Sequence, residues 1–268
     1  MDIVVIIGAI AFAFLLAFVM GMKGGFVRSS VMVWPILIGI ISGFAASTGL
    51  AGASLFLMLV LAFVLDVLIG TVILAVWFYR DPERTPPQDK HAILAPADGK
   101  IKYIRKIESG SFPFSEKNGR VIRLTEFVGT DSVPETGYII GIVMSILDVH
   151  VNRAPVAGTI TFVRHTPGLF LSLKKFEAFV QNERAAFLID TGGFRVGVVL
   201  IASRVVRKIV EYKKKGERVN AGERIGMIKF GSQTDLIVPS MVKINVREGD
   251  LVYAGETVIC TLKQEKGI

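Results

Sequence analysis

The sequence has little of the chemistry on which most enzymes depend. A single cysteine in 268 residues, Cys260, excludes an intramolecular disulfide and a cysteine-based metal site. Three histidines, His91, His150 and His165, lack the H-x-x-x-H or H-E-x-x-H spacing of a metal enzyme, so no metal is expected. The sequence also lacks the phosphate-binding loops G-x-x-x-x-G-K-[ST] and G-x-G-x-x-G and the G-x-S-x-G elbow of hydrolases. These absences argue against metal, nucleotide and serine-hydrolase chemistry.

Charge is scarce in the first third of the chain. Residues 1–79 contain four charged side chains, which cancel: Asp2, Lys23, Arg28 and Asp66. The whole net charge of +8 therefore belongs to residues 80–268. We predict a membrane anchor over 1–79 and a basic, water-facing domain over 80–268, which is long enough for a substantial core. Its basic residues are not interleaved with exposed aromatics, so no nucleic-acid partner is expected.

Three apolar runs predict two to three membrane helices. Ile3–Met20 and Leu55–Phe78 have spanning length, since about 20 helical residues cross the hydrocarbon core. Val31–Ala46 is shorter and carries Pro35, so it either spans with a tilt or re-enters. Three spans put the basic flanking segments on one side, and the positive-inside rule then predicts a cell-membrane protein with its large domain in the cytoplasm. Asp66, at the centre of the third run, is interpreted as a helix contact rather than a transport site.

Short apolar runs rich in valine and isoleucine characterise residues 80–268. They have strand length and little helical periodicity. The runs are Lys100–Ile104, Tyr138–Ile146, Thr159–Val163, Ala186–Asp190, Gly197–Ala202 and Val242–Val246. Leu171–Asn182 is the best candidate for a helix or an extended loop. The sequence therefore predicts a mainly β domain joined to an N-terminal α-helical transmembrane anchor.

Two internal repeats refine the predicted fold. The pattern A-P-x-x-G-x-I occurs at 95–101 and 154–160, and G-x-x-V-x-A-G-E-x-[IV] occurs at 216–225 and 249–258. Glycines that flank a short strand supply the positive φ of tight turns. The repeats therefore predict hairpins in a sandwich or flattened barrel, like the carrier domains that bear biotin or lipoate. They indicate a fold and no particular chemistry.

Four polar segments of this domain stand out together. They are F-Y-R-D-P-E-R at 78–84, A-P-A-D-G at 95–99, D-V-H-V-N-R-A-P at 148–155 with N-E-R at 182–184, and F-G-S-Q-T-D at 230–235. Each alone has an ordinary explanation, such as a turn or the charged end of a membrane helix. In combination they resemble the phosphatidylserine decarboxylase family, in particular its short-chain branch, which includes archaetidylserine decarboxylases. The resemblance runs from Phe78 to Thr261.

The resemblance implies an enzyme that makes its own cofactor. In the family, the serine of the G-S pair attacks the preceding carbonyl, and β-elimination leaves a pyruvoyl group at the new N-terminus. The corresponding cleavage here lies between Gly231 and Ser232, and the fragments 1–231 and 232–268 stay together as a heterodimer. The pyruvoyl group (pyruvate derived from Ser232) forms a Schiff base with the substrate and accepts the electrons released as CO₂ leaves.

The resemblance also implies roles for individual residues. His150 is the best candidate for the acid that returns a proton, because an imidazole titrates near neutral pH. Asp98 matches the family's A-D-G aspartate and orients a base or helps to activate Ser232. Longer members have a second histidine in H-x-x-H-x-P, where this chain has Arg153, a poor base because it stays protonated. Either His150 serves both steps, or self-cleavage relies on strain and Asp98, with His165 as a weaker option.

The remaining candidates are residues of the shared motifs and their surroundings. Candidates for substrate contact or structural support are Arg153, His165, Glu183, Arg184 and Asp235. Among them, a structural role is favoured for Glu183 and Arg184, since buried ion pairs are common structural features.

The sequence thus predicts a pyruvoyl-dependent decarboxylase that converts phosphatidylserine or archaetidylserine to the ethanolamine lipid plus CO₂. Its partners are an aminophospholipid substrate and the membrane, and the basic domain favours an anionic substrate. The alternative is a non-catalytic, membrane-anchored lipid-binding or biotinyl-like adaptor domain. The sequence leaves open the lipid tails and the oligomeric state, and a homo-oligomer is compatible with it.

Overall fold

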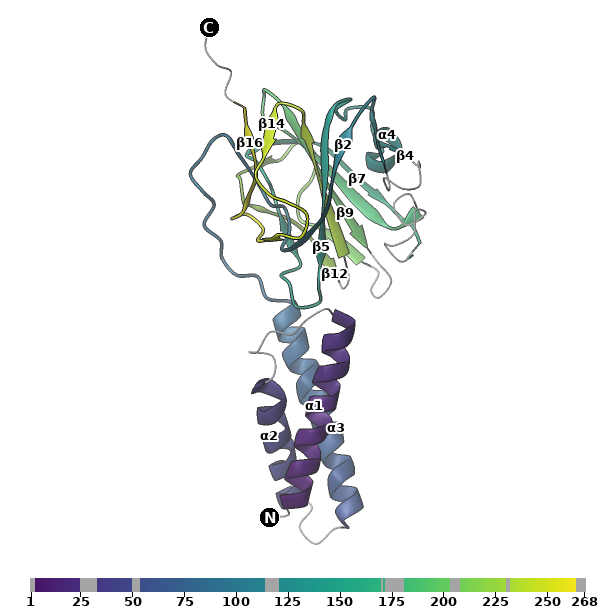
Figure 1. Cartoon of the computed structure of the whole chain (residues 1–268), viewed down its shortest axis with the longest axis vertical. Helices are drawn as coiled ribbons and strands as arrows, with labels where there is room; N and C mark the ends of the chain where they lie inside the picture. Colours follow the sequence, from purple (N-terminus) through teal and green to yellow (C-terminus); the bar gives the residue numbers. More distant parts are fainter. Residues whose placement is uncertain are drawn as a thin grey trace. The chain divides into compact units, whose positions relative to one another are not determined.

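The computed structural model describes residues 3–24, 33–49, 54–113, 121–169, 171, 181–202, 208–229 and 232–263. The chain divides into two compact units, Met1–Arg80 and Asp81–Ile268. The first unit is helical, and the second is mainly β (Figure 1).

Three helices make up the first unit: α1 (Ile3–Gly24), α2 (Val33–Gly49) and α3 (Leu55–Phe78). α3 begins after Ser54, whose side chain accepts a hydrogen bond from the Leu57 amide at 3.4 Å. Among the described residues, α3 is the one helix long and apolar enough to cross a membrane. The apolar stretches of the other two helices, Ile3–Phe14 and Pro35–Thr48, are shorter. Membrane spans by all three helices therefore stay predictions.

The carboxyl group of Asp66 lies between α2 and α3. Ser42 Oγ of α2 donates a hydrogen bond to Asp66 Oδ1, and both residues are buried. An acidic side chain in an apolar helix is costly unless it has a polar partner, which Ser42 provides. The bond ties α2 to α3, in agreement with the interpretation of Asp66 as a helix contact.

An eight-stranded antiparallel sheet forms the body of the second unit. In spatial order its strands are β11 (Arg218–Val219), β7 (Gly158–Thr166), β8 (Arg184–Asp190), β9 (Arg195–Ala202), β13 (Ser232–Pro239), β5 (Gly137–Met144), β2 (Gly99–Ile107) and β15 (Leu251–Val252). The sheet curls into a half-barrel (Figure 1). All six runs predicted as strands overlap with strands of the structure, so the prediction of a mainly β domain is confirmed. The candidate segment Leu171–Asn182 lies largely outside the described residues.

Smaller elements flank the main sheet. One three-stranded sheet contains β1 (Ala92–Leu94), β16 (Val258–Leu262) and β14 (Val242–Ile244), and another contains β10 (Lys208–Glu211), β12 (Arg224–Lys229) and β6 (Val151–Arg153). A two-stranded sheet of β3 (Ser111–Pro113) and β4 (Val121–Arg123) leads into α4 (Leu124–Val128). The predicted likeness to biotinyl carrier domains stays a prediction.

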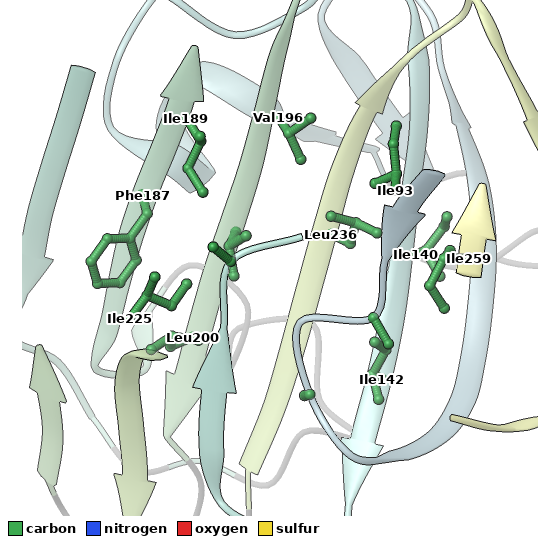
Figure 2. Close-up of a cluster of buried hydrophobic side chains, with 14 of the residues drawn as sticks. Ile93, Ile140, Ile142, Phe187, Ile189, Val196, Leu200, Ile225, Leu236 and Ile259 are labelled. Atoms are coloured by element: carbon green, nitrogen blue, oxygen red, sulfur yellow. The ribbon is translucent and has the colours of Figure 1, made fainter. Parts of the chain in front are cut away.

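Successive side chains of the main sheet point to opposite faces, as the period of two along a strand requires. One face packs against the three-stranded sheets, and its buried side chains include Ile140, Ile142, Phe187, Leu200 and Leu236, with Ile93, Ile225 and Ile259 opposite (Figure 2). The other face packs against β3, β4 and α4, and its buried side chains include Ile139, Leu188, Val199 and Ile237, with Phe112 and Phe127 opposite. Two apolar layers therefore enclose the sheet.

The sequence repeats have equivalent structures. Gly222 and Gly255, the second glycines of the longer repeat, both have positive φ, 78° and 74°, which side-chain-bearing residues rarely adopt. Their amides donate to Ala154 O and Ala95 O, each at 2.8 Å. Each copy of the longer repeat is thus bonded to one copy of the shorter repeat.

The two A-P turns of the shorter repeat are also bonded to each other. Leu94 N donates to Pro155 O at 2.9 Å, and Arg153 N donates to Pro96 O at 2.9 Å. Such reciprocal bonds between equivalent positions indicate a pseudo-twofold axis between the turns.

The pseudo-twofold axis divides the second unit into two halves of the same topology. One half runs continuously from β6 to β12, and the other comprises β1, β2, β5 and β13 to β16. In the main sheet, the order β11-β7-β8-β9 of the first half corresponds to β15-β2-β5-β13 of the second. The three-stranded sheets correspond as β6-β12-β10 and β1-β16-β14. The continuous half is therefore inserted between β5 and β13 of the other.

Because of the insertion, two paired strands that form a hairpin in one half are not joined by a turn in the other. In the continuous half, β8 turns directly into β9, and Asp190 pairs with Arg195. In the other half, the equivalent strands end at Met144 of β5 and begin at Ser232 of β13, and these two residues are paired in register. They are separated in the sequence by the whole inserted half, so Ser232 begins the strand at which the chain returns.

Candidate active site

The predicted cleavage position lies at the end of the main sheet where the inserted half leaves and returns. The backbone of Ser232 pairs with Met144 of β5 on one side and with Ala202 of β9 on the other. Gly231 and the Ser232 side chain lie outside the described residues. Pairing on both sides fixes the backbone at the start of β13.

Asp98 lies at the same end of the sheet, immediately before β2. Lys100 of β2 pairs with Val143 of β5, and β5 separates β2 from β13. Asp98 therefore lies two strands away from position 232, which corresponds to about 10 Å between strand axes.

The carboxylate of Asp98 is buried and held in one orientation. Its Oδ1 accepts a hydrogen bond from Ala254 N at 2.7 Å, and its Oδ2 accepts one from Arg84 at 2.9 Å. Arg84 also pairs with Glu256 at 2.6 Å. The A-D-G aspartate is thus tied both to the longer repeat and to the R-D-P-E-R segment.

His150 is fully buried beside β12, in the connection from β5 to β6. Its Nδ1 lies 2.9 Å from the carbonyl oxygen of Asp148, and its own carbonyl accepts a hydrogen bond from Ile228 N at 3.2 Å. A carbonyl oxygen is only an acceptor, so Nδ1 carries a proton and Nε2 is the basic nitrogen of the neutral ring. Ile228 is four residues before Ser232 in the sequence.

Arg153, the predicted counterpart of a second histidine in longer family members, holds the R-D-P-E-R segment through a terminal nitrogen, while its buried Nε has no hydrogen-bond partner among the described residues. It donates to Asp81 Oδ1 at 2.9 Å, to Pro82 O at 2.9 Å and to Gly222 O at 3.0 Å. Burial lowers the pKa of the guanidinium, whereas Asp81 raises it. Asp81 also accepts a hydrogen bond from Arg224. Arg153 therefore joins the R-D-P-E-R segment to Gly222 of the longer repeat.

His165 lies away from the cleavage position. It is on β7, and β8 and β9 separate it from β13. Its Nδ1 lies 2.9 Å from Glu211 and its Nε2 lies 3.3 Å from Glu183. Glu183 in turn accepts a hydrogen bond from Ile209 N at 3.2 Å. The structure therefore groups His165 and Glu183 with each other rather than with His150.

Arg184 begins β8 and points to the face of the sheet that α4 covers. Its Nε donates to Phe127 O at 2.9 Å, and its NH2 lies 3.3 Å from Glu126 O. A guanidinium that meets the last carbonyls of a helix complements the helix C-terminus. Desolvation by burial lowers the pKa of this group.

Two polar residues that the sequence did not single out lie near the start of β13. Asn152 is fully buried and donates from Nδ2 to Thr234 Oγ1 at 2.9 Å, while its Oδ1 has no hydrogen-bond partner among the described residues. The buried Oγ of Ser145, which follows Met144, likewise has none within the described part. Asn152 lies within the D-V-H-V-N-R-A-P motif, which was its only signal in the sequence.

Asp235 belongs to a buried polar group on the face of β13 that is opposite to Thr234 and Asn152. Tyr103 OH donates to Asp235 Oδ2 at 2.8 Å, and Gln233 Nε2 donates to Asp235 Oδ1 at 2.7 Å and to the Tyr103 oxygen at 2.9 Å. Burial raises the pKa of Asp235 to about 7, and the hydrogen bonds from Tyr103 and Gln233 oppose this rise. Tyr103 and Gln233 were not candidates in the sequence, because their partners come from distant strands.

Comparison with known proteins identifies the class of enzyme. The sequence pattern of the phosphatidylserine decarboxylase family matches residues 72–260. The chain is 40% identical to a provisionally named archaetidylserine decarboxylase proenzyme of Methanocaldococcus jannaschii over 200 residues, which cover 72% of this chain and 92% of the relative. It is 37% identical to a phosphatidylserine decarboxylase proenzyme of Symbiobacterium thermophilum over 199 residues, which cover 74% of this chain and 83% of that relative.

These similarities define a decarboxylase, a carboxy-lyase of phospholipid biosynthesis that is made as a proenzyme. The chain belongs to the phosphatidylserine decarboxylase family, as the four polar segments predicted.

The position of Arg153 leads to a first prediction. We expect Arg153→His, which restores the histidine of longer family members, to lower the free energy of unfolding by about 2 kcal/mol, because a histidine cannot replace all three buried donations. Thermal and chemical unfolding of the full chain in detergent measures the loss. The control is Arg224→His, which affects the same Asp81 from a more exposed position and should cost less. Equal losses of stability in the two variants would contradict the stronger structural contribution expected of Arg153.

The raised pKa of Asp235 leads to a second prediction. In the unfolded chain its pKa returns to 3.8, so its contribution to stability is fully present below about pH 4 and is lost as the pH rises through about 7. The parent is the uncleaved Ser232→Ala protein, and the test variant carries Asp235→Asn in addition. Between pH 4 and pH 7 we expect the melting temperature of the parent to fall relative to that of the test variant, which has no carboxyl group to ionise at position 235. Parallel melting profiles over this range would show that the carboxyl group does not titrate in the folded state as stated.

Proposed function

We propose that this decarboxylase is pyruvoyl-dependent, that it cleaves itself between Gly231 and Ser232, and that it acts on a serine-headgroup phospholipid. The observation that carries the proposal is the register at the start of β13, where Ser232 is held between Met144 and Ala202 at the junction of the inserted half. The proenzyme names of the relatives support it.

Self-cleavage follows from the chemistry of a Gly-Ser pair. The Ser232 hydroxyl attacks the Gly231 carbonyl, and an ester replaces the peptide bond. β-Elimination then releases 1–231 with a free carboxylate and leaves a dehydroalanine at the start of 232–268. Water hydrolyses the imine form of this residue to the ketone, and its nitrogen leaves as ammonia. The smaller fragment begins with β13, which is hydrogen-bonded to β5 and to β9 along its length. This pairing supports a stable complex of the two fragments after cleavage.

The residues near the start of β13 fit a small polar group at the new N-terminus. The buried Asn152 Oδ1 and Ser145 Oγ offer hydrogen-bonding capacity that no described residue uses. When present, a pyruvoyl group supplies an electron sink that no side chain can provide. Asn152 is held by Thr234, two residues into β13, so this capacity is fixed relative to the strand.

His150 is proposed to move the protons. With Nδ1 directed at Asp148 O, its Nε2 holds the exchangeable proton and returns it to the substrate carbon that loses CO₂. Arg153 is engaged with Asp81, and His165 lies among carboxylates, so neither offers a base at this end of the sheet. We therefore assign the base of self-cleavage to His150 as well, with Asp98 as a buried carboxylate at the same end of the sheet.

The helical unit is proposed to attach the enzyme to the membrane that contains its substrate. α3 has the length and apolarity of a span. Lys23, Arg28, Arg80 and Arg84 flank the apolar runs, which supports a cytoplasmic catalytic domain by the positive-inside rule. The positive charge of the second unit favours an anionic lipid surface.

Intact mass tests self-processing directly. We expect the purified wild-type chain to separate into fragments of 231 and 37 residues, the smaller one blocked by a ketone that an amine and borohydride trap. Ser232→Ala should remain a single chain of 29.2 kDa, because it lacks the nucleophile. Conversion of phosphatidylserine vesicles to the ethanolamine lipid then tests the substrate. A wild-type protein that remains unbroken yet is active would contradict the pyruvoyl mechanism.

The double role of His150 can be separated by its rate effects. We expect His150→Gln to slow both self-cleavage and turnover by about 10²-fold to 10⁴-fold, the usual contribution of a positioned acid or base. Time-resolved mass measurement follows cleavage, and CO₂ release by the cleaved fraction follows turnover. His165→Gln is the matched control and should leave both rates near those of the wild type. Normal cleavage in His150→Gln would assign the base to another group.

A further inference from the structure

A buried polar group occupies an otherwise apolar layer of the domain. Tyr103, Gln233 and Asp235 are hydrogen-bonded to one another and are surrounded by the layer that includes Phe127, Leu188 and Ile237. Gln233 and Asp235 are fully buried, and Tyr103 is 7% exposed. Burying such groups costs free energy even when they are paired, so their presence calls for a reason other than packing.

The geometry joins two strands that are not neighbours. Tyr103 of β2 and Asp235 of β13 both pair in register with Gly141 of the strand between them, β5. A Cβ atom at Gly141 would lie 2.5 Å from the Tyr103 ring, so the ring lies directly over this glycine. The absence of a side chain at 141 therefore lets the tyrosine reach across β5 to the carboxyl group.

A β-bulge supplies a further contact. The pairing of β2 with β5 shifts between Ile101 and Tyr103, which makes Lys102 the extra residue. Its Nζ donates to Gln233 Oε1 at 3.4 Å. Residues of β2 therefore hold the side chains of both Gln233 and Asp235 in β13.

The other half of the domain provides an internal comparison. Its β7 has the same bulge, between Ile160 and Phe162, and Phe162 pairs with Leu188 as Tyr103 pairs with Gly141. The position equivalent to Asp235 is Gly197, which pairs with Leu188. The buried Tyr103–Asp235 pair of one half thus corresponds to Phe162 and Gly197 in the other. The position of Gln233 corresponds to Arg195, which forms an exposed ion pair with Asp190.

The two halves differ in how their equivalent strands begin. β9 follows β8 through a tight turn, in which Thr191 N donates to Phe194 O at 3.0 Å, and a tight turn fixes strand register. β13 has no such turn, because Ser232 follows the inserted half. If the bond before Ser232 breaks, the strand begins at a free chain end, which frays unless side chains hold it.

We propose that Tyr103, Gln233 and Asp235 form a register clamp that holds the first residues of β13 against β5 and β2 once the chain is cleaved. The clamp rests on the proposed self-cleavage. Its members are positioning residues: they fix where the new N-terminus lies and do not touch the substrate. In the continuous half, the tight turn performs this function.

Hydrogen exchange of the full-length protein tests the clamp. We expect Tyr103→Phe to speed exchange of the amides of residues 233–238 about tenfold in the cleaved protein, because the strand end loses a buried hydrogen bond. In the uncleaved Ser232→Ala background, where the chain continues through position 232, the same substitution should have less than about twofold effect. We also expect kcat to fall while KM stays near the wild-type value, since the substrate contacts are unchanged.

Matched variants exclude a general loss of stability. Phe162→Leu, at the equivalent position of the other half, should affect exchange equally in cleaved and uncleaved protein. If Tyr103→Phe does not fold, Gln233→Leu takes its place. It removes two donations, leaves Tyr103 bonded to Asp235, and should likewise speed exchange in the cleaved protein more than in the uncleaved one. Equal effects of either clamp variant in both backgrounds would overturn the clamp and leave self-cleavage intact. A wild-type chain that never cleaves would overturn self-cleavage, and the clamp with it.

Discussion

The pairing of β13 between β5 and β9 is the constraint on which the rest of the structure depends. This one strand joins the two pseudo-symmetric halves, contributes to both apolar layers and begins at Ser232. Hydrogen bonds on both sides make its register stable, because a slip by one residue would exchange the side chains of the two faces. The proposed cleavage before Ser232 leaves both rows of these hydrogen bonds in place.

The pseudo-twofold axis separates what the fold needs from what the chemistry needs. Both halves share the positive-φ glycines Gly222 and Gly255 and the bonds from those glycines to the A-P turns. At equivalent positions one half has Asp98 and the other has Ala157. Since the backbone pattern persists without the acidic side chain, the turn itself does not need it. The carboxylate of Asp98 instead binds Ala254 N and Arg84.

The R-D-P-E-R segment links several parts of the catalytic unit through its charges. Asp81 meets Arg153 and Arg224, and Arg84 meets Asp98 and Glu256. Arg153 therefore holds this segment within the catalytic unit. Its planar guanidinium reaches several acceptors at once, which an imidazole cannot do.

Local features of the sequence determined much of this protein. Helical length predicted Leu55–Phe78, and short apolar runs rich in valine and isoleucine predicted the strands. The motif set identified the family and directed attention to Asp98, His150 and Ser232. Only the tertiary structure decided which distant residues meet. Arg153 and Asp81 are 72 residues apart, and Tyr103 and Asp235 are 132 apart. Strand order and register bring such pairs together, and the period of a single strand contains no information about its neighbours.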